Sequence, residues 1–258
     1  MKETLSELLK RRPNVNFIVN AGQYDLARDN RYLVPFMVYE HNEIRYGFVD
    51  KDDNIVIPAI YDKVFDDFYN KEDLVRVGKR FCIDYGTPKK PRQYYYFHCG
   101  LIDSTGKELI PCDKYYELYF SGIPDLLIAH GSRQKAECAL IDIHGNEIVP
   151  YGKYHDIYHF VFGFARTQDK NGWGIIDEDG HSIIPSGEFE EIWNLDAQYP
   201  HTVVQHKGVR YTLPIEVLKK LQQELKTTGV ITTSVEQYLD YQNYLQRDFT
   251  HGTWMTFE

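Results

Sequence analysis

The sequence lacks both an excess of positive charge and any apolar run approaching the roughly 18 residues of a membrane-spanning helix. Its 29 Lys and Arg stand against 38 Asp and Glu, a formal net charge of -9. This sign repels phosphate backbones, so we expect no nucleic-acid partner. Only a short amphipathic stretch precedes Lys10-Arg11-Arg12, unlike a signal peptide. We therefore expect a cytoplasmic protein that does not contact membranes.

Cysteine pairs at metal-binding or redox spacing are also lacking. The four cysteines lie 17, 13 and 26 positions apart, at Cys82, Cys99, Cys112 and Cys138. No Cys-x-x-Cys motif results, and we expect reduced, buried thiols. His155 and His159 are four positions apart, but in a strand this spacing separates them by about 13 Å, too far for one ion. We predict no metal site and no cofactor.

Aromatic residues, by contrast, are plentiful. The 21 Tyr, 14 Phe and 3 Trp make up 15% of the chain, more than helical bundles normally carry. Such side chains suit strands that pack on each other. With 43% apolar and 26% charged residues, the composition is that of a globular protein of one or two domains. The sequence predicts a mainly β fold.

An internal repeat specifies the architecture. One pattern occurs four times, each time as a short apolar run that closes on an aspartate: Asp50, Asp103, Asp142 and Asp177. Three residues later stands Asp53 in the first copy and a glycine in the others, Gly106, Gly145 and Gly180. Eight residues after the aspartate stands a proline: Pro58, Pro111, Pro150 and Pro185. An aromatic and then an aliphatic residue follow each proline.

Each copy reads as a hairpin followed by a third strand. The aspartate caps the turn with its side chain, and the glycine closes the turn in the left-handed conformation. Proline, which cannot donate to a ladder, is expected to end the second strand. Identical placement in every copy is what a turn requires, whereas catalysis needs different groups to converge. We therefore interpret the four aspartates as structural.

The copy beginning at Trp173-Gly174, with its turn at Asp177 and its proline at Pro185, resembles the bacterial WG-repeat family. The other three copies resemble diverged members, since Tyr46, Cys99 and Cys138 stand where Trp173 does. We interpret the two cysteines as small packing substitutes. The resemblance covers about residues 24–214. It implies a β-repeat domain and supplies no active site.

The ends of the chain differ from the middle. We expect an N-terminal helix in residues 1–13, a repeat domain of four clear units and a decayed fifth in 14–213, and a helical cap and tail in 214–258. Thr233 and Glu236 have capping-box spacing within that cap.

The chain starts in mid-unit at Tyr24, which favours a propeller-like ring closed by the N-terminal strand. An open β array of three-stranded units is the alternative.

A basic, aromatic insertion separates the first two hairpins at residues 85–98. Such a combination occurs in protein hot spots and in stacking on bases or sugars. A solvated hairpin tip is the more common explanation. If the protein has a specific contact loop, the candidates are Lys89, Lys90, Arg92, Tyr94, Tyr95 and Tyr96.

Two classes of function compete. The first is a non-catalytic scaffold for another protein, in its specific form an inhibitor or immunity-type protein that neutralises a basic toxin or enzyme. The second is recognition of a carbohydrate or small ligand through exposed aromatics, with Tyr94–Tyr96, Trp173 and Trp193 as the residues to test. We expect no enzyme, because no nucleophile–base pair, phosphate loop or metal cluster stands out.

Overall fold

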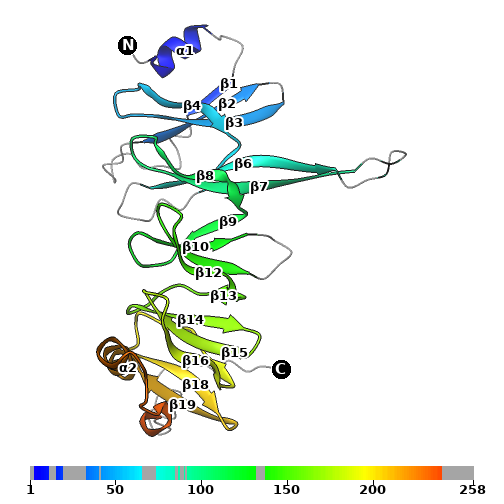
Figure 1. Cartoon of the computed structure of the whole chain (residues 1–258). Helices are drawn as coiled ribbons and strands as arrows, with labels where there is room; N and C mark the ends of the chain where they lie inside the picture. The colour runs from blue at the N-terminus through cyan, green and yellow to red at the C-terminus, as the bar shows by residue number, and fades with distance from the viewer. Residues whose placement is uncertain are drawn as a thin grey trace, which may run out of the picture. The chain divides into compact units, whose positions relative to one another are not determined.

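The computed structural model describes residues 3–11, 16–19, 33–40, 42–65, 74–84, 87, 90, 92–131 and 137–239. This part of the chain is mainly β (Figure 1). It divides into two compact units, one formed by 1–119, 129–135 and 142–146, and the other by 120–128, 136–141 and 147–258. None of the described helices has the length and apolar character needed to cross a membrane.

The strands form five sheets in which strands adjacent in the chain are also adjacent in space. The first sheet contains β1 (Asn16–Val19), β2 (Val34–Glu40), β3 (Glu43–Val49) and β4 (Ile55–Tyr61). The second contains β5 (Lys63–Val64), β6 (Val75–Asp84), β7 (Gln93–Ile102) and β8 (Glu108–Tyr115). The third contains β9 (Glu117–Phe120), β10 (Leu126–His130), β11 (Cys138–Asp142) and β12 (Glu147–Tyr154).

The fourth sheet contains β13 (Asp156–Ile157), β14 (Phe164–Asp169), β15 (Gly172–Asp177) and β16 (Ser182–Phe189). The fifth contains β17 (Glu191–Ile192), β18 (His201–His206) and β19 (Val209–Pro214). It is the decayed unit that the sequence predicts after the last hairpin. Each sequence copy supplies three longer strands, as expected, but these strands are divided between two consecutive sheets. In the last copy, for example, β15 and β16 pair in the fourth sheet, whereas the third strand, β18, pairs with β19 in the fifth.

A single residue carries the chain from one sheet to the next. These residues are Asp62, Tyr116, His155 and Glu190, and each lies between a buried aromatic residue and a short strand. Each donates its backbone N–H to a carbonyl of the following third strand over 2.7–2.9 Å, the acceptors being Gly78, His130, Gln168 and Gln205. The aromatic-to-aliphatic segment recognised in the sequence is therefore the crossing between sheets.

The repeated prolines do not end their strands, so that prediction is wrong. β4 continues for three residues beyond Pro58, and β16 continues for four beyond Pro185. Pro111 and Pro150 occupy the same place in β8 and β12. All four are exposed, and the pairing register shifts around them. Each of these strands is the edge of its sheet, where a residue without an N–H is tolerated at a bulge.

The N-terminal strand does not complete the last sheet. β1 pairs with β2, from Asn16 opposite Tyr39 to Val19 opposite Phe36. Within the described residues, no sheet combines strands from both ends of the chain. Closure through a shared sheet is thus absent there, and a ring remains a prediction. Tyr24, on which the mid-unit start partly rests, lies outside the described residues.

Helices cover the first and last sheets. In α1 (Leu5–Arg11), Leu5 is buried against Phe36, Val38 and Val49. Thr4 and Glu7 form a capping box at its start, because the Thr4 N–H donates to the Glu7 carboxylate and the Glu7 N–H donates to Thr4 Oγ1. The sequence analysis did not single out this box.

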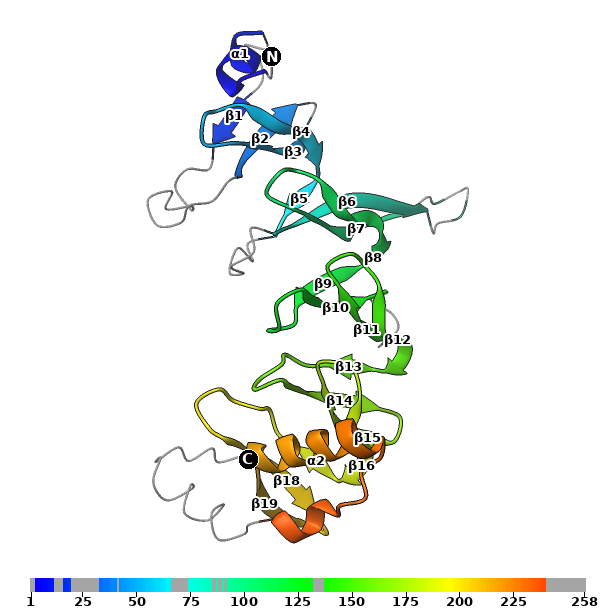
Figure 2. The same cartoon turned by 60° about the vertical axis from the view of Figure 1, so that its left-hand side comes forward.

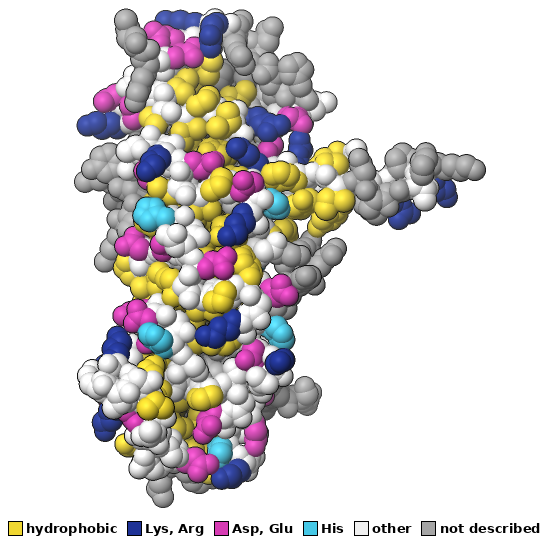
Figure 3. Space-filling model, viewed as in Figure 1, with side chains coloured by type: hydrophobic (Ala, Val, Ile, Leu, Met, Phe, Trp, Pro, Cys, Tyr) yellow, Lys and Arg dark blue, Asp and Glu magenta, His cyan; other side chains and the backbone are white. Residues whose placement is uncertain are grey.

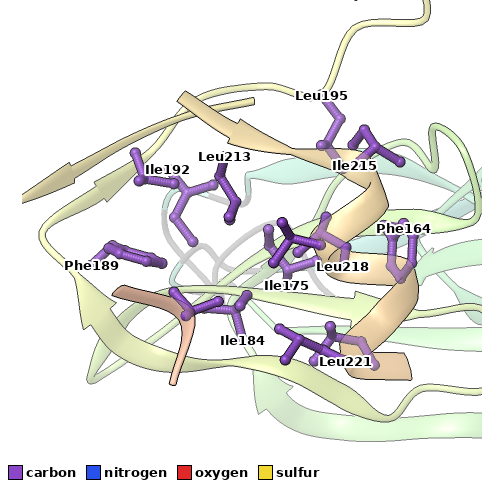
Figure 4. Close-up of a cluster of buried hydrophobic side chains, with 14 residues drawn as sticks. Phe164, Ile175, Ile184, Phe189, Ile192, Leu195, Leu213, Ile215, Leu218 and Leu221 are labelled. Carbon is purple, nitrogen blue, oxygen red and sulfur yellow. The ribbon is translucent and has the colours of Figure 1, made fainter. Parts of the chain in front are cut away.

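At the other end, α2 (Ile215–Thr228) packs its buried side chains on the fourth and fifth sheets (Figures 2 and 4). Leu218 and Leu221 lie among Phe164, Ile175 and Ile184. A 3-10 helix, Val235–Tyr238, follows with Ser234 at its N-cap and no side-chain cap. The capping box expected at Thr233 and Glu236 is therefore wrong. The predicted tail, 249–258, lies outside the described residues.

Candidate functional site

The four repeated aspartates have one geometry. In each copy Oδ1 accepts the backbone N–H groups of the second and fourth following residues over 2.8–3.1 Å. The turn residues Gly106, Gly145 and Gly180 have φ between 77° and 85°, and Asp53 has φ 64°. A Cβ on Gly180 would also lie 2.6 Å from Val149 Cγ2. These carboxylates are committed to closing turns.

The surroundings of these carboxylates alter their acidity. For Asp142, burial alone would raise the pKa, but the hydrogen bonds from Asn146 and His144 outweigh it and lower the pKa. Asp103 has a lowered pKa for the same reason, with hydrogen bonds from Thr105 and Lys107. Both turns therefore favour the ionised aspartate.

One described group has potential metal ligands within 4.8 Å of one another: Asp177, Asp179 and His181. The chain itself uses these groups. Asp177 Oδ1 accepts the N–H groups of the other two residues, and its Oδ2 accepts Gln222 Nε2 at 3.1 Å. Lys226 Nζ lies 3.6 Å from Asp179 Oδ2. The arrangement is that of a turn braced by α2.

The cysteines at the repeat column pack against tyrosines. Cys99 is paired with Tyr115 and Cys138 with Tyr154, as Trp173 is paired with Phe189. Both thiols are fully buried. Burial raises the pKa of Cys99 to about 11 and that of Cys138 to about 12, which keeps both in the unreactive thiol form at neutral pH.

Trp173 contacts a cation from its own chain. The Arg166 guanidinium lies 4.2 Å from the Trp173 ring and 4.1 Å from the Tyr158 ring. Its Nη1 donates to the Ile192 carbonyl at 2.7 Å. Burial lowers the pKa of this guanidinium, as expected for a partly desolvated cation. Trp193 is similarly covered, with Arg210 at 5.0 Å.

The same device occurs at the equivalent position of an earlier copy. Arg76 lies between the rings of Phe65 and Tyr119, at 5.0 and 5.4 Å, and donates to the Leu118 carbonyl. Both arginines therefore join a third strand to the short strand that follows the next hairpin. Sequence reasoning missed them. The available signal was an arginine in the same column of two third strands, directly after the apolar residues Val75 and Ala165.

The candidate contact segment is largely strand rather than loop. β6 and β7 pair without a register shift over ten residue pairs, from Val75 opposite Ile102 to Asp84 opposite Gln93. Arg92 precedes β7, whereas Tyr94, Tyr95 and Tyr96 belong to it. Residues 79–84 and 93–98 form a two-stranded extension of the second sheet, which we call the arm (Figures 1 and 2). Lys90 exchanges two backbone hydrogen bonds with Thr87, and Lys89 lies outside the described residues.

Aromatic side chains form a ladder along one face of the arm. Phe81 contacts Tyr96 and His98, with centroids 5.9 and 4.5 Å apart, and Tyr94 stacks on Tyr96 at 6.4 Å. The exposed fractions of Ile83 and Tyr94 on this face are 49% and 42%, and that of Tyr95 on the opposite face is 51%. Figure 3 shows hydrophobic side chains where the arm leaves its sheet and basic side chains beyond its outer end. Phe81 and Ile83 were not among the predicted residues.

Charged groups fix the base of the arm. Asp62 accepts the Arg80 N–H at 2.7 Å and pairs with Arg45 at 2.8 Å. Arg80 and Arg45 also pair with Glu43 on the first sheet. These contacts therefore fix the direction in which the arm leaves the second sheet.

The family described as WG containing repeat matches residues 46–80, 140–172 and 173–197. These matches begin at or within the first, third and fourth copies. The second copy, whose first strand forms part of the arm, is outside them. No curated protein matches the chain.

Proposed function

Because the chain is a WG-repeat protein, we propose that it is a non-catalytic scaffold that binds another protein, with the arm as its contact element. The observation that carries this proposal is the exposed aromatic ladder. Clustered Tyr side chains are typical of the residues that contribute most to binding energy, and Tyr94 and Tyr95 are exposed. Repeat scaffolds suit this role, because surface elements can lengthen while the repeat core is kept.

The exposed arm is unfavourable for the stability of the isolated protein. Two-stranded hairpins are marginally stable in water, and this one exposes large apolar side chains on both faces. By comparison, the equivalent strands β14 and β15 pair over six residues, and β2 and β3 pair over seven. A partner that covers the ladder would remove this apolar area from water.

A second form of the scaffold proposal, which does not use the arm as its contact, is an inhibitor or immunity-type protein for a basic toxin or enzyme. It is supported by the formal charge of -9. Such a basic partner would contact the acidic remainder of the chain, since the segment that contains the arm is itself basic. Removal of the arm would then leave binding intact.

The alternative is recognition of a carbohydrate or small ligand. Trp173 and Trp193 give it little support, because arginines of the chain already lie over their rings. The stacked Tyr94 and Tyr96 are the remaining platform. A glycan screen with Tyr94→Ala as the control variant tests this alternative directly.

An affinity capture tests the scaffold proposal. Tagged full chain is compared with a variant in which Asn-Gly replaces residues 82–95, a turn that can join the facing residues Phe81 and Tyr96. The control is Lys207→Asn, which places Asn-Gly in another two-residue turn and leaves the arm unchanged.

The expected result is a partner recovered by the full chain and the control but lost with the shortened arm. If all three chains recover the partner equally, the contact lies in the acidic remainder of the chain and not in the arm. Failure of every chain to enrich a protein from its host lysate would contradict the scaffold proposal and leave the ligand alternative.

A further inference from the structure

We propose that the arm binds an acidic polypeptide segment as an added β-strand along the outer edge of β7. This inference rests on the proposed function, since it specifies the kind of partner and how it is held. It is carried by three observations: an edge that extends beyond its neighbouring strand, the absence of the edge protection seen elsewhere in the fold, and a local charge opposite to that of the chain.

The outer edge of β7 is only partly covered. β8 pairs with β7 at Cys99, Leu101 and Ile102. The six residues 93–98 lie beyond this pairing, although β6 pairs with all of them on the other side. Within the described chain they form a strand edge three times the length of the two-residue strands β5 and β13.

Hydrogen bonds at the base of the arm establish which peptide groups of β6 point outward. The Gly78 carbonyl accepts the Asp62 N–H at 2.8 Å, and the Arg80 N–H donates to the Asp62 carboxylate at 2.7 Å. The peptide groups of Gly78 and Arg80 therefore point away from β7. Because this direction alternates along a strand, the odd-numbered residues of β6 direct theirs toward β7.

The register carries this alternation across to β7. Phe81 lies opposite Tyr96, so the peptide groups of Tyr96 point toward β6. Those of Tyr95 and Phe97 consequently point toward the outer edge. A strand added there would be held by backbone hydrogen bonds at these two residues, with the aromatic side chains of β7 beside its own.

Other sheet edges of this protein carry protection against pairing. β4, β8, β12 and β16 are edge strands, and each contains a proline and a register shift. Both features prevent a further strand from adding. Residues 93–98 contain no proline, and the β6–β7 register is unbroken. The arm is thus an unprotected edge in a fold that protects its equivalent edges.

Charge favours an acidic peptide as the occupant. The segment 79–98 contains five Lys and Arg and one Asp, a formal charge of +4 in a chain of -9. Two arms paired edge to edge would bring like charges together, which disfavours a second copy. Nucleic acid would be attracted by the arm but repelled by the rest of the chain, and it offers no backbone donors and acceptors at strand spacing.

Peptide binding tests this proposal with the full chain. The probe is a labelled nine-residue peptide of alternating Glu and Val, with binding measured by fluorescence anisotropy at low salt. Two matched probes carry Lys in place of Glu, or N-methyl groups on the amides of one edge. We expect the acidic peptide to bind at least about tenfold more tightly than either, since each matched probe lacks the charge or the backbone donors.

Two variants of one residue separate the edge from the side chain. Tyr95→Pro removes an outward N–H while leaving the β6 ladder intact, and should weaken binding about tenfold. Tyr95→Thr keeps the N–H and should stay within about threefold. If the N-methylated peptide binds the unaltered protein as tightly as the unmodified acidic peptide, the proposal is overturned. This comparison does not depend on the folding of any variant.

Other outcomes also decide the matter. No binding of the acidic peptide, tighter binding of a single-stranded oligonucleotide, or self-association of the chain that is lost in Tyr95→Pro would each overturn it. The proposed function fails separately. A partner that is captured by the full chain and lost with the shortened arm, but captured equally well by Tyr95→Pro, would retain the scaffold proposal and remove only the added strand.

Discussion

The turn carboxylates are the residues on which each hairpin depends most directly. Asp142 illustrates this, because its Oδ1 accepts two N–H groups and its Oδ2 accepts Asn146 Nδ2 at 2.7 Å. A side chain without an acceptor would leave these donors to water and would free the backbone of the turn.

We predict that Asp142→Ala lowers the free energy of unfolding by about 1 kcal/mol, whereas Asp142→Asn, which keeps an acceptor, costs less. The pKa of Asp142 is lowered in the folded state, so its charge stabilises the fold above the ordinary Asp pKa. That contribution is lost as the pH falls through the lowered value. Urea unfolding should show a smaller wild-type advantage over Asp142→Asn at pH 3 than at pH 7.

Arg166 is a second residue whose contribution can be measured. Lysine keeps its charge but loses the planar group that lies between Tyr158 and Trp173. We predict that Arg166→Lys costs about 1–2 kcal/mol, and that a double-mutant cycle with Trp173→Leu gives a coupling of about 0.5–2 kcal/mol. Arg210→Lys, at the more distant Trp193 contact, is the control. Additive effects at Arg166 and Trp173 would contradict the role given to this pair.

Phe162 has a backbone conformation that suits other residues better. Its φ is 55°, followed by 84° at Gly163, in a two-residue turn closed by two hydrogen bonds between Val161 and Phe164. Such a turn favours Asn-Gly. Because the Phe162 side chain is exposed, we predict that Phe162→Asn raises the free energy of unfolding by about 0.5–1 kcal/mol, while Phe162→Ala gives no gain. Thermal unfolding of both variants measures this, and a loss of stability in Phe162→Asn would show that the phenyl ring contributes contacts.

Among the elements, α2 closes the last two sheets. Leu218 is fully buried in the cluster that joins β15, β16 and β19 to the helix. We predict that Leu218→Ala costs about 2–5 kcal/mol and increases amide exchange in β16 and β19. Lys219→Ala, on the exposed face, should cost under about 0.5 kcal/mol. Equal effects of the two substitutions would contradict the capping role.

The hairpins and their turns could be predicted because their determinants are local. Asp142 and Gly145 fix one turn within four residues, whatever lies beyond. The pairing of β18 could not be predicted in this way, since the sequence of one copy does not say which neighbouring hairpin its third strand joins. The proline prediction failed because Pro185 lies at an edge, and edge position is a property of the sheet.

Only one of the two strands of the arm could be identified from the sequence. The aromatic run at Tyr94–Tyr96 stood out by composition, but β6 supplies the other half through Phe81 and Ile83. Alternating apolar residues that continue past the usual length of the third strand were the missed signal. Arg166 was missed because a charged residue in a strand is ordinarily placed at the surface.

For the whole molecule, solution scattering tests the ring that the mid-unit start predicts. A closed, compact arrangement of 258 residues should have a radius of gyration of about 18 Å. An open array should give a distinctly larger value and an extended pair-distance distribution. The measurement is made on the full chain under reducing conditions, because Cys82 is exposed, contrary to the prediction that all four thiols are buried.

The single-residue crossings have a consequence for how such a chain changes in evolution. The turn aspartates are 53, 39 and 35 residues apart, and the second, third and fourth sheets are each entered and left at one of the four crossings. A duplication or deletion of one period therefore rejoins equivalent points wherever its breakpoints fall, and each remaining sheet stays complete. The number of sheets can change by unequal recombination without a new linker, whereas the arm, confined to one hairpin, can diverge without altering that count.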